Sequence, residues 1–365
     1  MFSQPPNPLE TMTTQLRSSF ISNGSLWKEI AAFFVDCNLW DIYFDSAYVS
    51  LYQGGDESKR VEAYCYEADG NRFFLPYLKA PIPGFPGLWD FQTAYGYGGP
   101  LATTDDQQFL SAAWAEFERE ARSRGVICGL LRFHPLLNTT RYATRPVSII
   151  SDRDTVWLDL HRRFEDIYTD YSKENRRKLK KATREGVSVE VCTGRDSLSK
   201  FASLYVARMS ELRARSDYFF DEEYFSSIDA LGADGYRVYL CYSKCRELVG
   251  GALILLSTDY VHYHLSAARK EWFHLSPNNV LRDSVIRDYV GGGRSAIHFG
   301  GGLTSDPSDS LLAFKLNFSR QRLRFHIGTC ILDAERYEAV RNEWLSRVEA
   351  ERQERFGRFL QCYRY

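Results

Sequence analysis

Lys315 lies inside an apolar run, LLAFKLNF at residues 311–318. A lone ammonium in such surroundings is costly unless it meets an anion. The sequence therefore predicts that Lys315 contacts a phosphate, a carboxylate or a developing oxyanion. Arg320, Arg322 and Arg324 follow with a period of two, so the alternative is a basic edge strand that protects against aggregation.

A second group of candidates follows the strand-like run at residues 259–267. Alternation places His262, His264 and Ser266 on one face of that strand. A histidine there could take a proton from an attacking amine, and we assign this role to His264, with deprotonation by the substrate itself as the alternative. The alternative is a set of hydrogen-bonded core groups. Two histidines without a visible partner motif are too few ligands, so no metal site is predicted.

The N-terminal half contains two motifs, YGYGGP at 95–100 and RFHP at 132–135. The glycines of the first would let a ligand approach the main chain, and its tyrosines could stack or hydrogen-bond. Arg132 ends a buried strand and could hold a phosphate or carboxylate. The alternatives are an ordinary surface turn and an ion pair between domains. The candidate binding residues here are Tyr95, Tyr97, Gly98, Gly99, Arg132 and His134.

A charged helix in the second half has a strong basic excess. The residues near one of its faces are Lys173, Arg177, Lys180, Lys181 and Arg184. Such a stripe offers several phosphate contacts at once and predicts a tRNA-facing patch, although many charge runs are simply solvated faces. The net charge of the whole chain is -1, which gives no support for DNA binding.

The chain of 365 residues, 44% hydrophobic and 25% charged, suits two globular domains. It has no Gly-x-Ser-x-Gly motif and no cysteine beside a histidine, so a covalent acyl-enzyme is not supported. We find no run long enough to span a bilayer and no secretion signal in MFSQPPNPLE, so we expect a cytoplasmic protein without an integral membrane segment.

The elements predicted from periodicity mix helices with antiparallel strands in both halves, which indicates an α+β fold. We expect a mobile tail at 1–24, a first domain at 25–145, and a second domain with a C-terminal helix at 146–365. The predicted helices are 25–38 (capped by Ser25), 105–124, 163–185, 196–213, 277–290 and 334–357. The predicted strands are 41–52, 60–67, 72–79, 126–133, 155–160, 236–242, 248–257, 259–267 and 295–299, with Asp69-Gly70-Asn71 forming a hairpin turn.

Several of these segments, in this order, resemble FemAB-like proteins. They are YGYGGP, RFHP, YSKENRRKLKKATREGVSVEV, HYHLSAARKEWFHLSPNNVL, FGGG, LLAFKLNF and the ending CYRY. The resemblance covers roughly residues 40–365. It implies two tandem GNAT-like domains, each a mixed, mostly antiparallel sheet flanked by helices.

The resemblance also implies an activity: transfer of an aminoacyl group from aminoacyl-tRNA to an amine, without a cofactor. The acceptor would be a peptidoglycan precursor or an intermediate of a natural-product or envelope pathway. Phe314 and Lys315 match a Phe-Lys pair at the donor channel of FemX-like enzymes, and Asn278 is placed among the substrate-binding residues. We expect a monomer or a weak dimer.

Two departures from the family pattern affect the substrates. A carboxylate tends to follow the first-domain Gly-Pro closely in peptidoglycan ligases, whereas here Asp105 comes later. A CoA-dependent GNAT enzyme would carry a glycine-containing pyrophosphate loop where this chain has ARKEWFHLSPNNVL. The alternative function is nevertheless a GNAT N-acyltransferase that uses acyl-CoA or acyl carrier protein on an amino sugar or other small amine.

Overall fold

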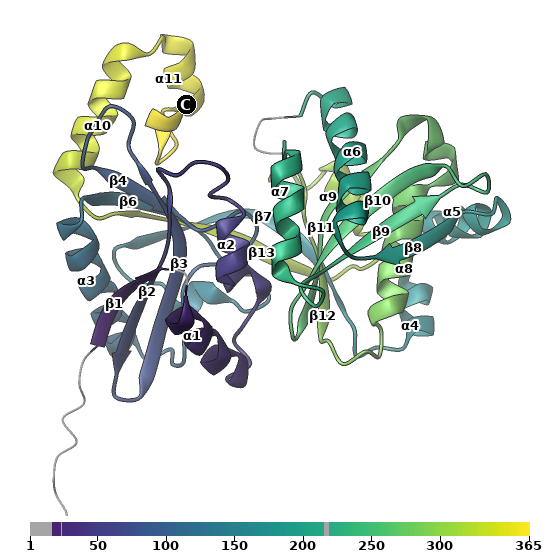
Figure 1. Cartoon of the computed structure of the whole chain (residues 1–365), viewed down its shortest axis with the longest axis horizontal. Coiled ribbons are helices and arrows are strands. Elements are labelled where there is room, and N and C mark those ends of the chain that lie inside the picture. Colours follow the sequence, from purple (N-terminus) through teal and green to yellow (C-terminus); the bar gives the residue numbers. More distant parts are fainter. Residues whose placement is uncertain (1–16, 23, 215–218) are drawn as a thin grey trace, which may run out of the picture.

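The computed structural model describes residues 17–22, 24–214 and 219–365. Within these residues a single mixed sheet of 13 strands runs through the whole molecule, in the order β1-β2-β3-β4-β6-β13-β7-β12-β11-β10-β9-β8, with β5 paired to β3. Figure 1 shows the N-terminal half on the left, the C-terminal half on the right, and β7 and β13 between them. The two halves are therefore joined by strand pairing as well as by the chain.

The strands have the following bounds, in chain order. They are β1 (Arg17–Ser22), β2 (Arg60–Ala68), β3 (Asn71–Pro81), β4 (Trp89–Gln92), β5 (Leu101–Ala102), β6 (Val126–Arg132), β7 (Val147–Asp159), β8 (Ser188–Cys192), β9 (Tyr236–Tyr242), β10 (Leu248–Leu256), β11 (Tyr260–Ala268), β12 (Ala296–Gly301) and β13 (Arg322–Ile331). Most neighbours are antiparallel, and the parallel pairs are β4 with β6 and β11 with β12.

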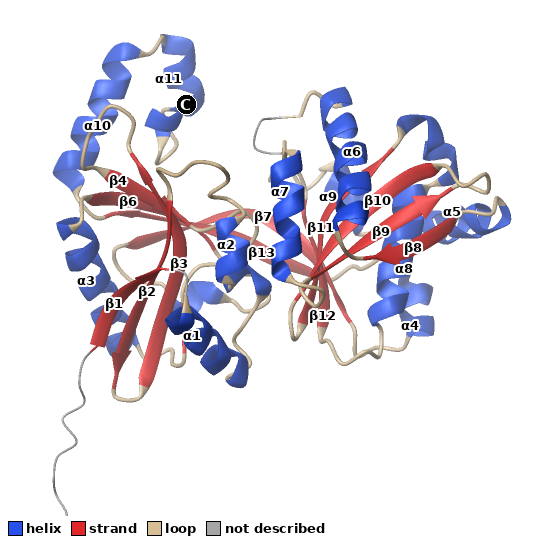
Figure 2. Ribbon diagram, in the orientation of Figure 1, coloured by secondary structure: helices blue, strands red, loops and turns tan. Residues whose placement is uncertain are grey.

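Helices flank the sheet in both halves (Figure 2). The α-helices are α1 (Ser25–Asp36), α2 (Ser46–Ser50), α3 (Gln107–Ser123), α4 (Phe164–Asp170), α5 (Lys173–Arg184), α6 (Arg195–Glu211), α7 (Glu222–Ser227), α8 (Pro277–Tyr289), α9 (Ser310–Lys315), α10 (Ala334–Arg347) and α11 (Ala350–Phe356). Short 3-10 turns include η1 (Ile42–Phe44) and η5 (Lys270–Leu275). None of the helices in the described parts of the chain has the length and apolar character needed to cross a bilayer.

Each half repeats one arrangement, an antiparallel meander followed by a parallel strand–helix–strand unit. In the N-terminal half α3 connects β4 to β6, and in the C-terminal half α8 connects β11 to β12. Parallel neighbours need such a crossover, whereas antiparallel ones need only a turn. The predicted α+β fold with two mixed, mostly antiparallel units is confirmed.

The predicted hairpin is confirmed, since β2 and β3 pair from Ala68↔Asn71 outward. Its two-residue loop, Asp69 and Gly70, has φ values of 51° and 75°. Positive φ at both positions is what a type I′ turn requires, and Asp-Gly adopts it at low cost.

Several predicted elements were wrong for local reasons. Residues 41–52 form η1 and α2 rather than a strand, because the Asp41 and Asp45 carboxylates accept backbone hydrogen bonds from Tyr43 (3.3 Å) and Ala47 (2.7 Å). Such caps favour helical turns over extended chain. The predicted helix 163–185 is divided because Ser172 caps α5 by accepting from Asn175 N at 3.0 Å.

Further differences concern the ends of elements. The N-cap of α1 is Gly24 rather than Ser25, without a side-chain cap. The predicted helix 334–357 is α10 followed by α11. Strand β7 begins at Val147, eight residues before the predicted strand 155–160.

The ends of the chain also differ from the predicted domain assignment. Of the predicted tail, residues 17–22 form β1, which pairs antiparallel with β2, and residues 1–16 and 23 lie outside the described part. The C-terminal helix was assigned to the second domain, but Tyr337 and Val340 of α10 pack against Ile127 and Cys128 of β6. The last strand and helices therefore return to the N-terminal half.

Three main cores lie on the faces of the sheet. One lies between α3 and the sheet of the N-terminal half, and a second packs α4, α5 and α8 against the C-terminal half. The third runs across both halves, from Trp27 and Phe34 of α1 to Phe201 and Tyr205 of α6. Because this core is shared, the two halves are not independent.

The ending CYRY is anchored by a buried carboxylate. Asp90 on β4 accepts from Arg364 (2.6 and 2.8 Å) and from the Tyr363 hydroxyl (2.8 Å).

We expect Arg364→Ala to lower the free energy of unfolding by about 2–3 kcal/mol, less than the cost for a fully buried pair because Arg364 is 25% exposed. Urea titration followed by tryptophan fluorescence measures this, with exposed Arg358→Ala as the control. Equal effects of the two variants would contradict the anchor.

Candidate active site

Lys315 is buried at the end of α9, with 7% of the residue exposed. Its Nζ donates to the Gly301 carbonyl at 2.6 Å, and no carboxylate within the described residues forms an ion pair with it. Burial, followed by the nearby Arg282 cation, holds the pKa of the ammonium well below its usual range. Lys315 is therefore buried, and its contact with an anion stays a prediction.

Tyr97 of the N-terminal half reaches the same point. A Cβ placed on Gly300 would lie 3.3 Å from both Lys315 Nζ and the Tyr97 hydroxyl. Gly300 has a φ of 73°, a conformation that favours glycine. The YGYGGP loop and the FGGG turn therefore meet at Lys315, although about 200 residues separate them along the chain.

A second cation lies nearby on α8. Arg282 is 2% exposed, and its guanidinium carbon lies 4.3 Å from the ring centroid of Tyr263 and 4.7 Å from that of Phe314. Its Nε has no hydrogen-bond partner among the described residues. Burial lowers the pKa of Arg282. The two basic side chains are close enough for Arg282 to lower the pKa of Lys315, and no described carboxylate forms an ion pair with either.

Both cations lie where two parallel strands stop pairing. Strands β11 and β12 pair only from Tyr260↔Ala296 to His262↔His298, although β11 continues to Ala268 and β12 to Gly301. Beyond that point β12 pairs with β7 alone. The Gly301 backbone, which has no partner on β11, bonds to side chains instead: its carbonyl accepts from Lys315 Nζ, and its N–H group donates to the Tyr97 hydroxyl.

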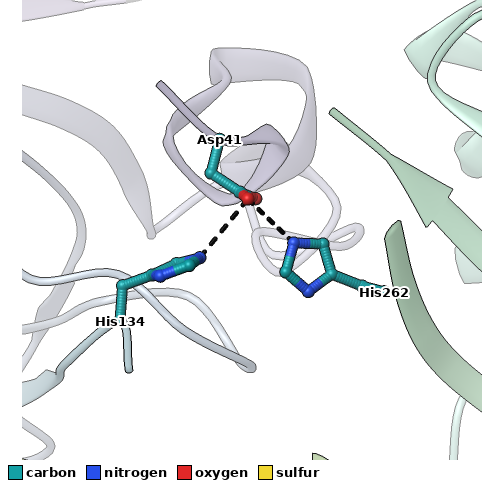
Figure 3. A group of neighbouring side chains, drawn as sticks. All are labelled: Asp41, His134 and His262. Carbon is teal, nitrogen blue, oxygen red and sulfur yellow. Dashed lines mark hydrogen bonds and ion pairs between the residues drawn. The ribbon is translucent and has the colours of Figure 1, made fainter. Parts of the chain in front are cut away.

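A buried carboxylate links the two halves beside this region. Figure 3 shows Asp41 of the N-terminal half between the rings of His134 and His262. Its Oδ2 lies 2.8 Å from His262 Nε2 and 3.3 Å from His134 Nε2, and all three side chains are at most 1% exposed. Burial alone would raise the pKa of Asp41, but the two histidines hold it well below its usual range.

The residue types of this cluster also suit a metal ion, since a carboxylate and two imidazoles can bind zinc. The hydrogen bonds favour another arrangement. Leu137 N–H donates to His134 Nδ1 at 3.1 Å, so the proton of the neutral ring is on Nε2. His134 therefore presents an N–H group to Asp41 rather than the lone pair that a metal requires. The cluster is better described as a hydrogen-bonded link between the halves.

His264 faces the N-terminal half from β11. Its Nε2 lies 2.8 Å from the Tyr224 hydroxyl, and its ring centroid lies 6.0 Å from that of Tyr95. Burial lowers the pKa of His264 to about 3. The imidazole is therefore neutral near pH 7 and can accept a hydrogen bond.

Arg132 makes no ion pair between domains, contrary to one of the two readings of the sequence. It donates to Thr93 O at 2.7 Å and to Gln92 Oε1 at 3.3 Å, both in its own half. Burial lowers its pKa, and no described carboxylate pairs with it. A buried guanidinium with neutral partners is suited to an anionic ligand.

The glycines of the YGYGGP loop shape the protein rather than expose its backbone. Gly98 N–H donates to Arg132 O at 2.8 Å, and its carbonyl accepts from His134 N at 3.0 Å. A Cβ on Gly99 would lie 2.9 Å from both the Phe133 ring and Thr139 Oγ. Gly98, Gly99 and His134, which were expected to contact the substrate directly, are buried in the structure.

The remaining candidates lie around Lys315 and on α5. Phe314 is half-buried against Phe318, and Asn278, in the first turn of α8, has a buried Oδ1 without a partner among the described residues. On α5, Arg177 is paired with Glu174 and Lys181 donates to His274 O at 3.0 Å. Within the described part of the chain, the exposed residues of the stripe that form no ion pair or side-chain hydrogen bond are Lys173, Lys180 and Arg184.

Sequence reasoning missed Asp41, Arg282 and His298. Asp41 was assigned to a strand, and its partners are about 90 and 220 residues away. Arg282 lies in NNVLRDSVIRDY, where it reads as an ordinary polar residue of a helix. The buried position of His298 beside Tyr97, with ring centroids 4.5 Å apart, depends on strand pairing. No local sequence signal marks these positions.

The fold is similar to that of known proteins. Residues 170–309 match the family model of an acetyltransferase (GNAT) domain. Among curated proteins none matches the sequence. The FemX crystal structure superposes with a TM-score of 0.66 at 14% identity, covering 88% of this chain and 99% of that chain.

Two further structures share the fold. L-PGS from Bacillus licheniformis gives a TM-score of 0.53 at 14% identity, covering 82% of this chain and 90% of that chain. The C-terminal domain of a putative lysylphosphatidylglycerol synthetase from Agrobacterium fabrum gives 0.51 at 16% identity, covering 83% and 92%. The fold expected from the resemblance to FemAB-like proteins, two tandem GNAT-like units, is confirmed.

The buried histidines predict how stability depends on pH. Burial lowers the pKa of His134, His264 and His298 below 6.5, so these rings stay neutral when folded but take up protons when unfolded. Their contribution to the free energy of unfolding is fully present above pH 6.5. It is lost as the pH falls, by up to about 1.4 kcal/mol per pH unit for each ring.

We expect His298→Phe to reduce this slope by about 1.4 kcal/mol per pH unit between pH 6 and 4. Urea unfolding at several pH values measures it. His161→Gln, on the surface, is the control. An unchanged slope in His298→Phe would show that His298 titrates alike in both states.

Proposed function

We propose that this protein is an aminoacyltransferase that moves an aminoacyl group from aminoacyl-tRNA to an amine, forming an amide bond. The observation that carries the proposal is the pair of buried cations, Lys315 and Arg282, without a described carboxylate partner. A buried charge needs a counter-charge. The phosphates at the 3′ end of a tRNA are anions that would meet it.

The position of the basic helix supports a tRNA donor. The first turn of α5 lies next to the chain that follows Lys315. Asn175 Nδ2 donates to Asn317 O at 3.3 Å, and Asn175 Oδ1 accepts from Asn279 Nδ2 at 2.9 Å. The exposed Lys180 and Arg184 extend away along the same helix. A stem resting on α5 would bring its acceptor end toward α9.

The start of α8 does not favour acyl-CoA, which GNAT enzymes hold with backbone N–H groups at this helix terminus. Pro277 at the first position has no N–H group. The N–H groups of Asn279 and Val280 both donate to Ser276 O, at 3.0 and 3.2 Å. Few donors remain for a pyrophosphate, so the alternative acyl-CoA reaction is disfavoured.

Arg132 and His264 support an acceptor that carries both an anionic group and an amine. Arg132 would hold a phosphate or carboxylate, with Tyr95 beside it. His264 would contact the amine. These requirements fit an anionic precursor of a peptidoglycan, envelope or natural-product pathway.

The chemistry needs no cofactor, because the aminoacyl ester is already activated. The amine nitrogen attacks the ester carbonyl, the C–N bond forms, the bond to the tRNA 3′ oxygen breaks, and the amine proton ends on that oxygen. Positioning and preorganised charge can each contribute several kcal/mol. Lys315 would hold a donor phosphate or the developing oxyanion, and Phe314 would line the donor path.

Replacing Lys315 tests the proposal. We expect Lys315→Met to lower kcat/KM by about 100-fold or more, because it removes preorganised charge at the donor. Stability should hold or rise, since an unpaired buried cation is lost. The assay is transfer from charged tRNA to amines, with RNase treatment abolishing it. Lys79→Met is the control, because Lys79 is also buried but lies in the N-terminal half near Glu62. Near wild-type transfer by folded Lys315→Met would refute the assignment.

The exposed cations of α5 give a second test. We expect Lys180→Glu/Arg184→Glu to raise the KM for the charged tRNA about tenfold at low salt and to make binding less dependent on salt. The KM for the acceptor should not change. Filter binding across a range of salt concentrations measures both effects, with the exposed pair Lys28→Glu/Arg60→Glu as a control that changes the net charge equally. The same salt dependence in the double variant and the wild type would place the tRNA elsewhere.

A further inference from the structure

Four tyrosines and a histidine form a continuous chain of hydrogen bonds between the two halves. The Tyr48 hydroxyl donates to the Tyr95 carbonyl at 2.8 Å and lies 3.0 Å from the Tyr52 hydroxyl. The Tyr52 hydroxyl lies 3.0 Å from that of Tyr224, which lies 2.8 Å from His264 Nε2. Tyr48, Tyr52 and Tyr95 belong to the N-terminal half, and Tyr224 and His264 to the other.

The number of protons fixes the direction of every bond. The chain has four contacts, and each needs one proton. The Tyr95 carbonyl supplies none, so Tyr48 donates to it and must accept from Tyr52. Tyr52 in turn accepts from Tyr224, whose own proton is then used. The fourth proton must therefore come from His264 Nε2.

The titration state of the groups supports this count. Burial raises the pKa of Tyr48, Tyr52 and Tyr224, so the phenols keep their protons near pH 7. Burial lowers the pKa of His264 to about 3, so its ring carries a single proton. With that proton on Nε2, Nδ1 presents a lone pair, and no described residue donates to it.

We propose that His264 Nδ1 accepts a hydrogen bond from the N–H of the neutral acceptor amine, and that Tyr224 and Tyr52 act as positioning residues that hold the imidazole in this tautomer. The proposal rests on the proposed function and assigns a role within it. A hydrogen bond from the amine to Nδ1 orients the nitrogen lone pair toward the donor carbonyl. The Tyr95 loop, at the far end of the chain of bonds, lies beside Arg132, so the two ends of the acceptor would be held by connected groups.

The role is orientation rather than strong base catalysis. A general base works best when its pKa lies near the working pH. The lowered pKa of His264 makes it a weak proton acceptor but leaves it a good hydrogen-bond acceptor. This distinguishes the proposal from the general base first considered for His264.

The tautomer can be observed without any activity. Protein labelled with ¹⁵N-histidine shows by NMR which ring nitrogen carries the proton, and His264→Gln identifies the signal. We expect a protonated Nε2 and an unprotonated Nδ1, unchanged from pH 8 to pH 5. In Tyr224→Phe, Nε2–H loses its acceptor, so protonated Nδ1 should appear. A protonated Nδ1 in the wild type would overturn the proposal.

Kinetics test the contact with substrate. We expect Tyr224→Phe to raise the KM for the acceptor about three- to tenfold and to leave the KM for the charged tRNA unchanged. Tyr239→Phe is the matched control, since Tyr239 donates to Asp288 at 2.8 Å outside this chain of bonds. An unchanged acceptor KM in Tyr224→Phe, or the same rise in Tyr239→Phe, would overturn the role. A wild-type protein inactive with every charged tRNA would refute the proposed function, while the NMR result would still decide the tautomer.

Discussion

The site depends on two positive charges, Lys315 and Arg282, that are buried without a described carboxylate to neutralise them. Removing such charges from water costs several kcal/mol each, and neither the Gly301 carbonyl nor the aromatic rings beside Arg282 recover that cost in full. Positions that break a stability rule without local compensation are expected at functional sites. In the proposed reaction the donor would supply the missing negative charge.

The two halves form one unit because polar side chains of one half contact the other half. Tyr97 reaches the turn that Lys315 contacts, and Asp41 bonds to His262 on a strand of the other half. The aromatic core between α1 and α6 continues the same contact. Buried polar links fix relative positions more strictly than apolar packing does, because a displaced partner leaves an unsatisfied group. The proposed transfer, which joins two substrates, would need the relative positions of the two halves to stay fixed.

The sequence predicted the elements better than it predicted the site. Periodicity located most helices and strands, and the Asp69-Gly70 hairpin followed from turn chemistry. Periodicity failed where side chains cap the backbone, as at Asp41, because a pattern of apolar residues does not show which side chains hydrogen-bond to the backbone. Lys315 could be selected from the sequence because a lysine inside an apolar run stands out there. Arg282 could not, since its partners come from β11 and α9 and depend on the fold.

The most direct measurement is a crystal structure of the protein with a short RNA that ends in the aminoacylated CCA sequence. The account predicts a phosphate oxygen about 3 Å from Lys315 Nζ and a second contact to the guanidinium of Arg282. RNA bound elsewhere, with Lys315 still bonded only to Gly301 and Arg282 only to its aromatic neighbours, would contradict it.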